Sequence, residues 1–137
     1  MADPADEVLA VLGAFIDEVN GGNIPAALGR LTADVCIVED IAPFRWTGPE
    51  GGGQWLADMA ANAGRLGVTA IAMKAGEPRR VEVEGEHGYI IIPGRVTLDG
   101  PDVALAEEGL LTFATRSEGG EWRIAALTWT GDRAEPA

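Results

Sequence analysis

The sequence predicts an α+β fold: three N-terminal helices packed in the concave face of a curved, mainly antiparallel sheet, which together form a cone-shaped α+β barrel. Two observations predict it. Apolar residues recur roughly every three or four positions up to Gly67 and alternate with polar residues beyond it, a change from helical to strand periodicity. The later segments are joined by short turns rich in glycine and proline, which favour antiparallel neighbours.

Composition narrows the classes of partner. The 137 residues are expected to form one domain, residues 1–137, with 22 acidic against 10 basic residues and a net charge of −12. That balance argues against nucleic acid and against an anionic membrane surface. One cysteine and one histidine exclude an internal disulfide and a Cys/His zinc site, so neither a metal nor a cofactor is expected. The acidic start of the chain and the unpaired Cys36 favour a cytoplasmic protein.

Capping residues define the helices. The first helix is expected to begin after Asp3 and to end at Asn20-Gly21-Gly22, because Asp caps helix starts and glycine accepts the backbone conformation of helix ends. Asn23 is expected to cap a second, shorter helix. The third helix is expected to start at Gly48-Pro49-Glu50 and to end at Gly67.

Short β-rich runs separated by turn-forming residues define the strands. They are residues 35–38, 68–75, 80–84, 89–98, 103–115 and 122–130. Residues 41–53 are expected to form a loop in which the third helix begins. Gly94 and Gly109 lie inside two of the strands, where a bend is expected. A bent sheet over helices leaves a conical space in which a small molecule can bind.

Four short motifs separate these elements in order: Asn20-Gly21-Gly22-Asn23, Leu31-Thr32-Ala33-Asp34, Val38-Glu39-Asp40 and Gly48-Pro49-Glu50-Gly51. Over residues 5–131, this combination resembles the nuclear-transport-factor-2-like superfamily, and within it the SnoaL-like and ketosteroid-isomerase-like branches. The resemblance implies the cone-shaped fold, a homodimer and cofactor-free chemistry on a small molecule. It does not fix the reaction, because one fold hosts many functions.

Asp40 is the first candidate for catalysis. Strand alternation places it on the same face as Cys36 and Val38, with Ile37 and Glu39 on the opposite face. An acid at the end of an apolar strand face can enter a dry pocket, where desolvation raises its pKa and makes it a usable base near neutral pH. In the isomerase branch the corresponding acid is the proton-transferring base, so the resemblance implies this role for Asp40. The alternative is an ordinary acid that caps the following loop.

The sequence departs from the isomerase pattern. That branch carries a tyrosine oxyanion donor on its first helix, and the matching Phe15 has no donor, so steroid isomerase activity is not expected. Of Glu107 and Glu108, at most one faces the cone, and the sequence leaves open which. A glutamate that faces Asp40 would form a pair of coupled carboxylates; the favoured alternative is that one of the two is solvated and the other pairs with Arg95, Arg116 or Arg123. Asp40, Arg95 and Glu107 together resemble the carboxylate–arginine–carboxylate set of some epoxide hydrolases of the superfamily.

Aromatic and methionine side chains form a second constellation. They suit an adaptable apolar ligand site, and the alternative for most of them is ordinary core. The candidates are Phe15, Phe44, Trp46, Trp55, Met59, Met73, Tyr89 and Trp129. Trp46 is expected to lie over the mouth of the cone as a lid or ligand wall.

Two functions follow from these residues. The first is a SnoaL-like enzyme that transfers protons on an apolar, ring-containing metabolite, as an isomerase, cyclase or dehydratase. The second is a non-catalytic ligand-binding or interaction module on the same fold. A homodimer is expected because Tyr89–Ile92 is apolar on both strand faces, the pattern of a strand that is covered on both sides.

Overall fold

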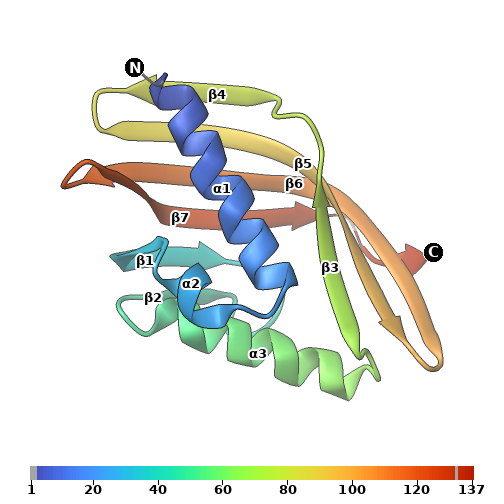
Figure 1. Cartoon of the computed structure of the whole chain (residues 1–137). Helices are drawn as coiled ribbons and strands as arrows, with labels where there is room; N and C mark the ends of the chain where they lie inside the picture. Colours follow the sequence, from blue (N-terminus) through green and yellow to red (C-terminus); the bar gives the residue numbers. More distant parts are fainter. Residues whose placement is uncertain (1–2, 132) are drawn as a thin grey trace.

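The computed structural model describes residues 3–131 and 133–137, and it has the expected α+β architecture. Helices α1 (Pro4–Asn20), α2 (Ile24–Leu28) and α3 (Gly51–Arg65) lie on one side of an eight-stranded sheet (Figure 1). The strands are β1 (Leu31–Val38), β2 (Arg45–Thr47), β3 (Ala70–Ala75), β4 (Arg80–Glu84), β5 (His87–Gly100), β6 (Val103–Glu118), β7 (Glu121–Gly131) and β8 (Glu135–Pro136). In the described part of the chain, no helix is long and apolar enough to span a membrane.

The sheet is mainly antiparallel, as expected. Its order is β2-β1-β7-β6-β5-β3, with β4 added to β5 and β8 added to β6. The pairing of β1 with β7 is parallel. These two strands are separated by most of the chain, so their connection is long enough for a parallel crossover.

Strand β5 changes its neighbour halfway along, and this bends the sheet. Its first half pairs with β4 from His87 to Ile91, and its second half pairs with β3 from Gly94 to Asp99. Pro93 lies between the two halves, where the missing N–H of proline breaks no ladder bond. Figure 1 shows β3 turned steeply away from β4, so the sheet curls around one end of α1.

The helix boundaries follow the capping residues. The Asp3 carboxylate accepts a hydrogen bond from the N–H of Ala5 at 2.9 Å, as expected of a helix cap. Gly22 and Gly67, which follow α1 and α3, both have a φ of +74°, the left-handed conformation that glycine accepts without strain. Asn23 precedes α2 but makes no side-chain capping bond.

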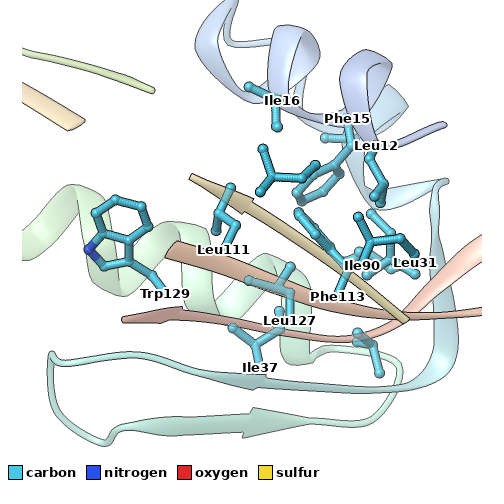
Figure 2. Close-up of a cluster of buried hydrophobic side chains, with 14 of the residues drawn as sticks. Leu12, Phe15, Ile16, Leu31, Ile37, Ile90, Leu111, Phe113, Leu127 and Trp129 are labelled. Carbon is cyan, nitrogen blue, oxygen red and sulfur yellow. The ribbon is translucent and has the colours of Figure 1, made fainter. Parts of the chain in front are cut away.

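The hydrophobic core fills the narrow end of the cone. Leu12 from α1 and Phe113 from β6 are fully buried, and Figure 2 shows α1 side chains facing those of the sheet. The rings of Phe15 and Trp55 stack with centroids 6.3 Å apart, which ties α1 to α3. The core therefore lies where β1 and β5 to β7 face α1 and α3.

Two strands were not predicted. Arg45–Thr47 forms β2 inside the expected loop, because it pairs antiparallel with the end of β1. Glu135–Pro136 forms β8 through pairing with Leu105 and Ala106. Both segments are too short to carry a periodic signal. Each forms a strand only because it pairs with another strand, so tertiary packing decides its structure.

Candidate functional site

A cavity of about 530 Å³ lies at the wide end of the cone, between α1, α3 and the far halves of β3, β5 and β6. Most of its wall is apolar: Phe15, Ile16, Val19, Ile24, Ile41, Trp55, Leu56, Met59, Ala60, Ala63, Leu66, Val68, Ile71, Met73, Val96, Leu98, Leu111, Phe113, Leu127, Trp129 and Ala134. The remaining lining residues are Asn20, Asn62, Glu39, Asp40, Glu107 and Arg133. A pocket of this size with a few polar groups in an apolar wall is typical of a small-molecule site.

Glu39 is brought into the cavity by the alternation of β1. Val35 and Ile37 point into the core with 1% and 0% of their surface exposed, and Glu39 continues their face. The ladder extends one step beyond β1, because the N–H of Glu39 donates to the carbonyl of Phe44 at 3.1 Å. The Glu39 carboxyl is therefore held inward by the same geometry that buries Ile37.

Burial raises the pKa of Glu39 to about 7. The apolar surroundings disfavour the charged form, and the negative charges of Asp40 and Glu107 add to the effect. The indole N–H of Trp55 acts in the opposite direction. Trp55 Nε1 is buried and has no partner of normal hydrogen-bond geometry among the described residues. Its approach to the Glu39 carboxyl therefore cancels only part of the pKa increase that burial causes.

Asp40 lies at the edge of the same cavity but is exposed. It is the first residue after the β1–β2 ladder and does not share the inward orientation of Glu39. The structure thus brings Asp40 and Glu39 to one end of the cavity, with Glu39 in the desolvated position.

Glu107 reaches the cavity from β6 and is fixed by an indole. Trp129 Nε1 on β7 donates a hydrogen bond to Glu107 Oε1 at 2.8 Å. Glu108 faces the other way, and its carboxylate pairs with Arg95 at 2.7 Å on the exposed surface. The choice that the sequence leaves open is settled in favour of Glu107.

A transverse row of three glycines makes room for the Trp129–Glu107 contact. Gly94, Gly109 and Gly131 are mutual neighbours on β5, β6 and β7. A Cβ at Gly109 would lie 2.7 Å from Trp129 Cζ2 and 2.5 Å from a backbone oxygen, and one at Gly131 would overlap the Glu107 carboxyl. The indole of Trp129 therefore lies over the glycines and reaches the Glu107 carboxylate. Side chains at the glycine positions would block this contact.

The wall on the α1 side is fastened by Asn20. Its side-chain amide donates to the carbonyl of Met73 at 2.8 Å and accepts from the N–H of Met73 at 2.9 Å. This two-way clip joins the end of α1 to β3, so two cavity-lining residues hold each other in place.

The sequence-predicted residues divide into two groups. The cavity is lined by seven of them: Asp40, Glu107, Phe15, Trp55, Met59, Met73 and Trp129. The other four lie elsewhere: Arg95, Phe44, Trp46 and Tyr89.

Each of these four has a physical reason for its position. Arg95 alternates outward and pairs with Glu108, so the carboxylate–arginine–carboxylate set is not assembled around the cavity. Phe44 is 57% exposed on the β1–β2 turn, and Tyr89 is on the outer face with Arg80 over its ring. Trp46, the expected lid, is instead buried on β2 with its Nε1 donating to Asp58 at 2.8 Å.

Two charged lining residues, Glu39 and Arg133, were not predicted from the sequence. The signal for Glu39 was present, since Val35 and Ile37 form a more apolar face than Cys36 and Val38, and the more apolar face is the inward one. No comparable signal exists for Arg133, which follows β7 on the segment leading to β8. Among the described residues, no three His, Cys, Asp or Glu side chains are grouped so as to hold a metal ion.

Comparisons with known proteins identify the fold. No protein-family model matches the chain, and no curated protein matches it. Solved structures do. A type 2 hexachlorocyclohexane dehydrochlorinase (LinA) superposes with a TM-score of 0.82 at 10% identity, covering 96% of this chain and 87% of that one.

Two further structures agree. A ketosteroid isomerase-like protein from Erwinia carotovora atroseptica has a TM-score of 0.77 at 14% identity, covering 97% of this chain and 99% of that one. A nuclear-transport-factor-2-like protein of unknown function from Pseudomonas putida has a TM-score of 0.74 at 15% identity, covering 92% and 84%. The chain has the nuclear-transport-factor-2-like fold, which confirms the expected architecture.

The buried Glu39 carboxyl predicts a specific dependence of stability on pH. Its pKa of about 7 in the folded protein lies above the ordinary value of 4.5, so the folded state holds a proton that the unfolded state has lost between these values. Glu39 therefore makes the free energy of unfolding fall as pH rises from 4.5 to 7. The Glu39→Gln variant should gain roughly 1–3 kcal/mol over wild type at pH 8 and almost nothing at pH 4, because glutamine has no charge to bury.

Chemical denaturation of wild type and Glu39→Gln between pH 4 and pH 8 measures the difference between their free energies of unfolding. The contributions of the other titratable groups cancel in this difference. Glu86→Gln, a change in an exposed turn, serves as the control and should follow wild type. A Glu39→Gln difference that is independent of pH would contradict the burial of an ionisable carboxyl.

Proposed function

We propose that the protein is a cofactor-free enzyme that moves a proton to or from a carbon atom of an apolar, ring-containing metabolite, in an isomerase, cyclase or dehydratase reaction. The observation that carries the proposal is the carboxyl of Glu39 in the apolar cavity, with a pKa of about 7. Near neutral pH, both of its protonation states are populated. Such a group can accept a proton in one step and return it in another.

The surroundings of Glu39 supply two further requirements of the reaction. The apolar wall desolvates the Glu39 carboxyl, so the ionised carboxylate is a stronger base than an exposed one. The buried N–H of Trp55, which lacks a complete hydrogen bond, is a donor for an oxygen atom on which charge develops during proton removal. This donor stands at the carboxyl end of the cavity, in contact with Glu39.

Asp40 and Glu107 complete the proposed site. Asp40, the base that the sequence predicts, is exposed at the edge of the cavity and follows Glu39 in the chain, so its proposed role is to exchange protons with bulk water. Glu107 is held by Trp129 and orients the substrate through its second oxygen. The hexachlorocyclohexane dehydrochlorinase that shares this fold supports the proposal, because dehydrochlorination removes a proton together with chloride.

Deuterium incorporation tests the proposal without knowledge of the substrate. Apolar fractions of a bacterial metabolite extract are incubated with the protein in deuterated water and examined by mass spectrometry. Wild type should add non-exchangeable deuterium to at least one compound. The Glu39→Gln variant should lower that rate by about 100-fold or more, because general acid–base catalysis typically contributes 10²–10⁴-fold.

Two matched variants sharpen the test. Asp40→Asn should reduce the rate less than Glu39→Gln does, and the opposite ranking would move the base to Asp40. Glu108→Gln, on the outer face one residue from Glu107, should leave the rate unchanged. Compounds that bind wild type but acquire no deuterium would support the second candidate function, a ligand-binding module, over an enzyme.

We also propose that two copies of the chain associate through the outer face of the sheet. Ile90 and Ile92 point into the core, while Tyr89 and Ile91 face outward, and Tyr89 is 39% exposed. An exposed apolar strand face in the middle of a sheet is typical of an interface.

Light scattering at micromolar concentration should give twice the chain mass of 14.3 kDa. Ile91→Arg should convert the protein to a monomer without unfolding it, as judged by circular dichroism. A monomeric wild type would overturn the dimer and would leave the proposed chemistry untouched, because every group assigned to it lies within one chain.

A further inference from the structure

The charges around the cavity are unbalanced. Three carboxyl groups line it, from Glu39, Asp40 and Glu107, against one guanidinium, that of Arg133. Glu39 and Asp40 follow β1, and Glu107 lies on β6, so acidic groups approach the cavity from two different strands. The negative charges of Asp40 and Glu107 are both close enough to Glu39 to disfavour its ionisation. The cavity therefore has an apolar body and a region of negative potential.

We propose that the ligand of this cavity is an apolar, ring-containing molecule that carries one basic nitrogen, whose ammonium group binds between the carboxyl groups of Glu39 and Glu107. The inference rests on the proposed function in one respect, that this cavity is the ligand site. It goes further in naming the charge of the ligand, and it holds for an enzyme and for a ligand-binding module alike.

Electrostatics favours a cation here over a neutral or anionic ligand. The negative charge of Glu107 disfavours the ionisation of Glu39, and a positive charge between the two carboxyl groups offsets that repulsion. An anionic ligand would add to the repulsion. Arg133 is exposed on the segment after β7, where solvent screens its charge, so it balances the carboxyl groups only weakly.

The hydrogen-bonding capacity of the site also matches an ammonium group. Trp129 occupies one oxygen of Glu107, and the other oxygen accepts no hydrogen bond from any described side chain. Carboxylates only accept hydrogen bonds when ionised, and an ammonium group only donates them, three in all. A neutral alcohol offers one donor and leaves the remaining oxygens unpaired.

Aromatic rings lie along the same wall. Phe15, Trp55 and Trp129 all line the cavity, and Phe15 and Trp55 are stacked at 6.3 Å between centroids. Flat rings pack against a ring-containing ligand, and tryptophan is the side chain whose face attracts a cation most strongly. The apolar body and the charged end of the ligand thus meet different parts of one surface.

Binding of an amine should be coupled to the release of a proton. The titratable and charged groups that line the cavity with Glu39 are Asp40, Glu107 and Arg133. A bound ammonium group reverses the unfavourable potential at Glu39, so the pKa of that carboxyl falls. At pH 6.5 roughly three quarters of Glu39 is protonated in the free protein, given a pKa of about 7, and most of these protons leave when the amine binds.

Three probes that share one ring system test the inference: 2-naphthylmethylamine, 2-naphthalenemethanol and 2-naphthoate. They differ chiefly in charge, being cationic, neutral and anionic at pH 6.5. Isothermal titration calorimetry with the full chain, in two buffers of different ionisation enthalpy, gives both the affinity and the number of protons released. The amine should bind at least about 10-fold more tightly than the alcohol, the anion most weakly, and only the amine should release more than half a proton.

Variants assign the effect to the named carboxyl groups. Glu39→Gln should abolish proton release and lower the affinity for the amine by about 10-fold, while the alcohol binds within about two-fold of wild type. Glu107→Gln should weaken the amine in the same selective way. Glu108→Gln, whose carboxylate pairs with Arg95 on the surface, is the control and should change neither quantity.

An alcohol that binds as tightly as the amine, or a naphthoate that binds more tightly, overturns the inference and leaves the cavity as a ligand site, so the proposed function survives. Binding of none of the three probes overturns both. Tight amine binding that is unchanged in Glu39→Gln and Glu107→Gln would locate the amine elsewhere and would also overturn the inference.

Discussion

The site depends on one constraint: the hydrophobic core does not fill all of the space between the sheet and the helices α1 and α3. Leu12 and Phe113 are fully buried, and the stacked Phe15 and Trp55 lie where the core meets the cavity. Beyond this point β5 exchanges β4 for β3, and the sheet bends away from α1. The core stabilises the fold, and the bend leaves a cavity beside it. The cavity wall is mostly apolar because inward-facing positions of the sheet and helices are apolar there, as they are in the core.

A carboxyl group in such a wall is costly, and the structure contains specific devices around it. The β1–β2 ladder holds Glu39 inward, the indole of Trp55 offsets its burial in part, and Trp129 lies on a row of glycines to reach Glu107. A leucine at position 39 would avoid the desolvation of a carboxyl. The retention of an ionisable group at a destabilising position is the pattern expected where function and stability conflict.

The sequence predicts the fold well because local patterns and global packing agree. Asp3 caps α1, Gly22 and Gly67 follow two helices, and residues 80–84 form a strand with the expected bounds. The predicted site is less complete because strand alternation alone does not say which face is inward, and the sequence indicates that face only through the greater apolarity of Val35 and Ile37. Asp40 and Glu39 differ by one residue, and a cavity-facing Glu39 follows only when Val35 and Ile37 are known to be the buried pair. Trp46 is fixed against α3, because Asp58 accepts a hydrogen bond from its indole N–H. No local sequence pattern predicts this contact.

Carbon-13 NMR of the protein labelled at glutamate carboxyl groups measures the protonation of Glu39 directly. The Glu39 resonance should titrate with a pKa near 7, well above the ordinary value of 4.5, and it should be missing from the spectrum of Glu39→Gln. A Glu39 resonance that titrates near 4.5 would contradict this result, because it would place that carboxyl in water and not in the cavity.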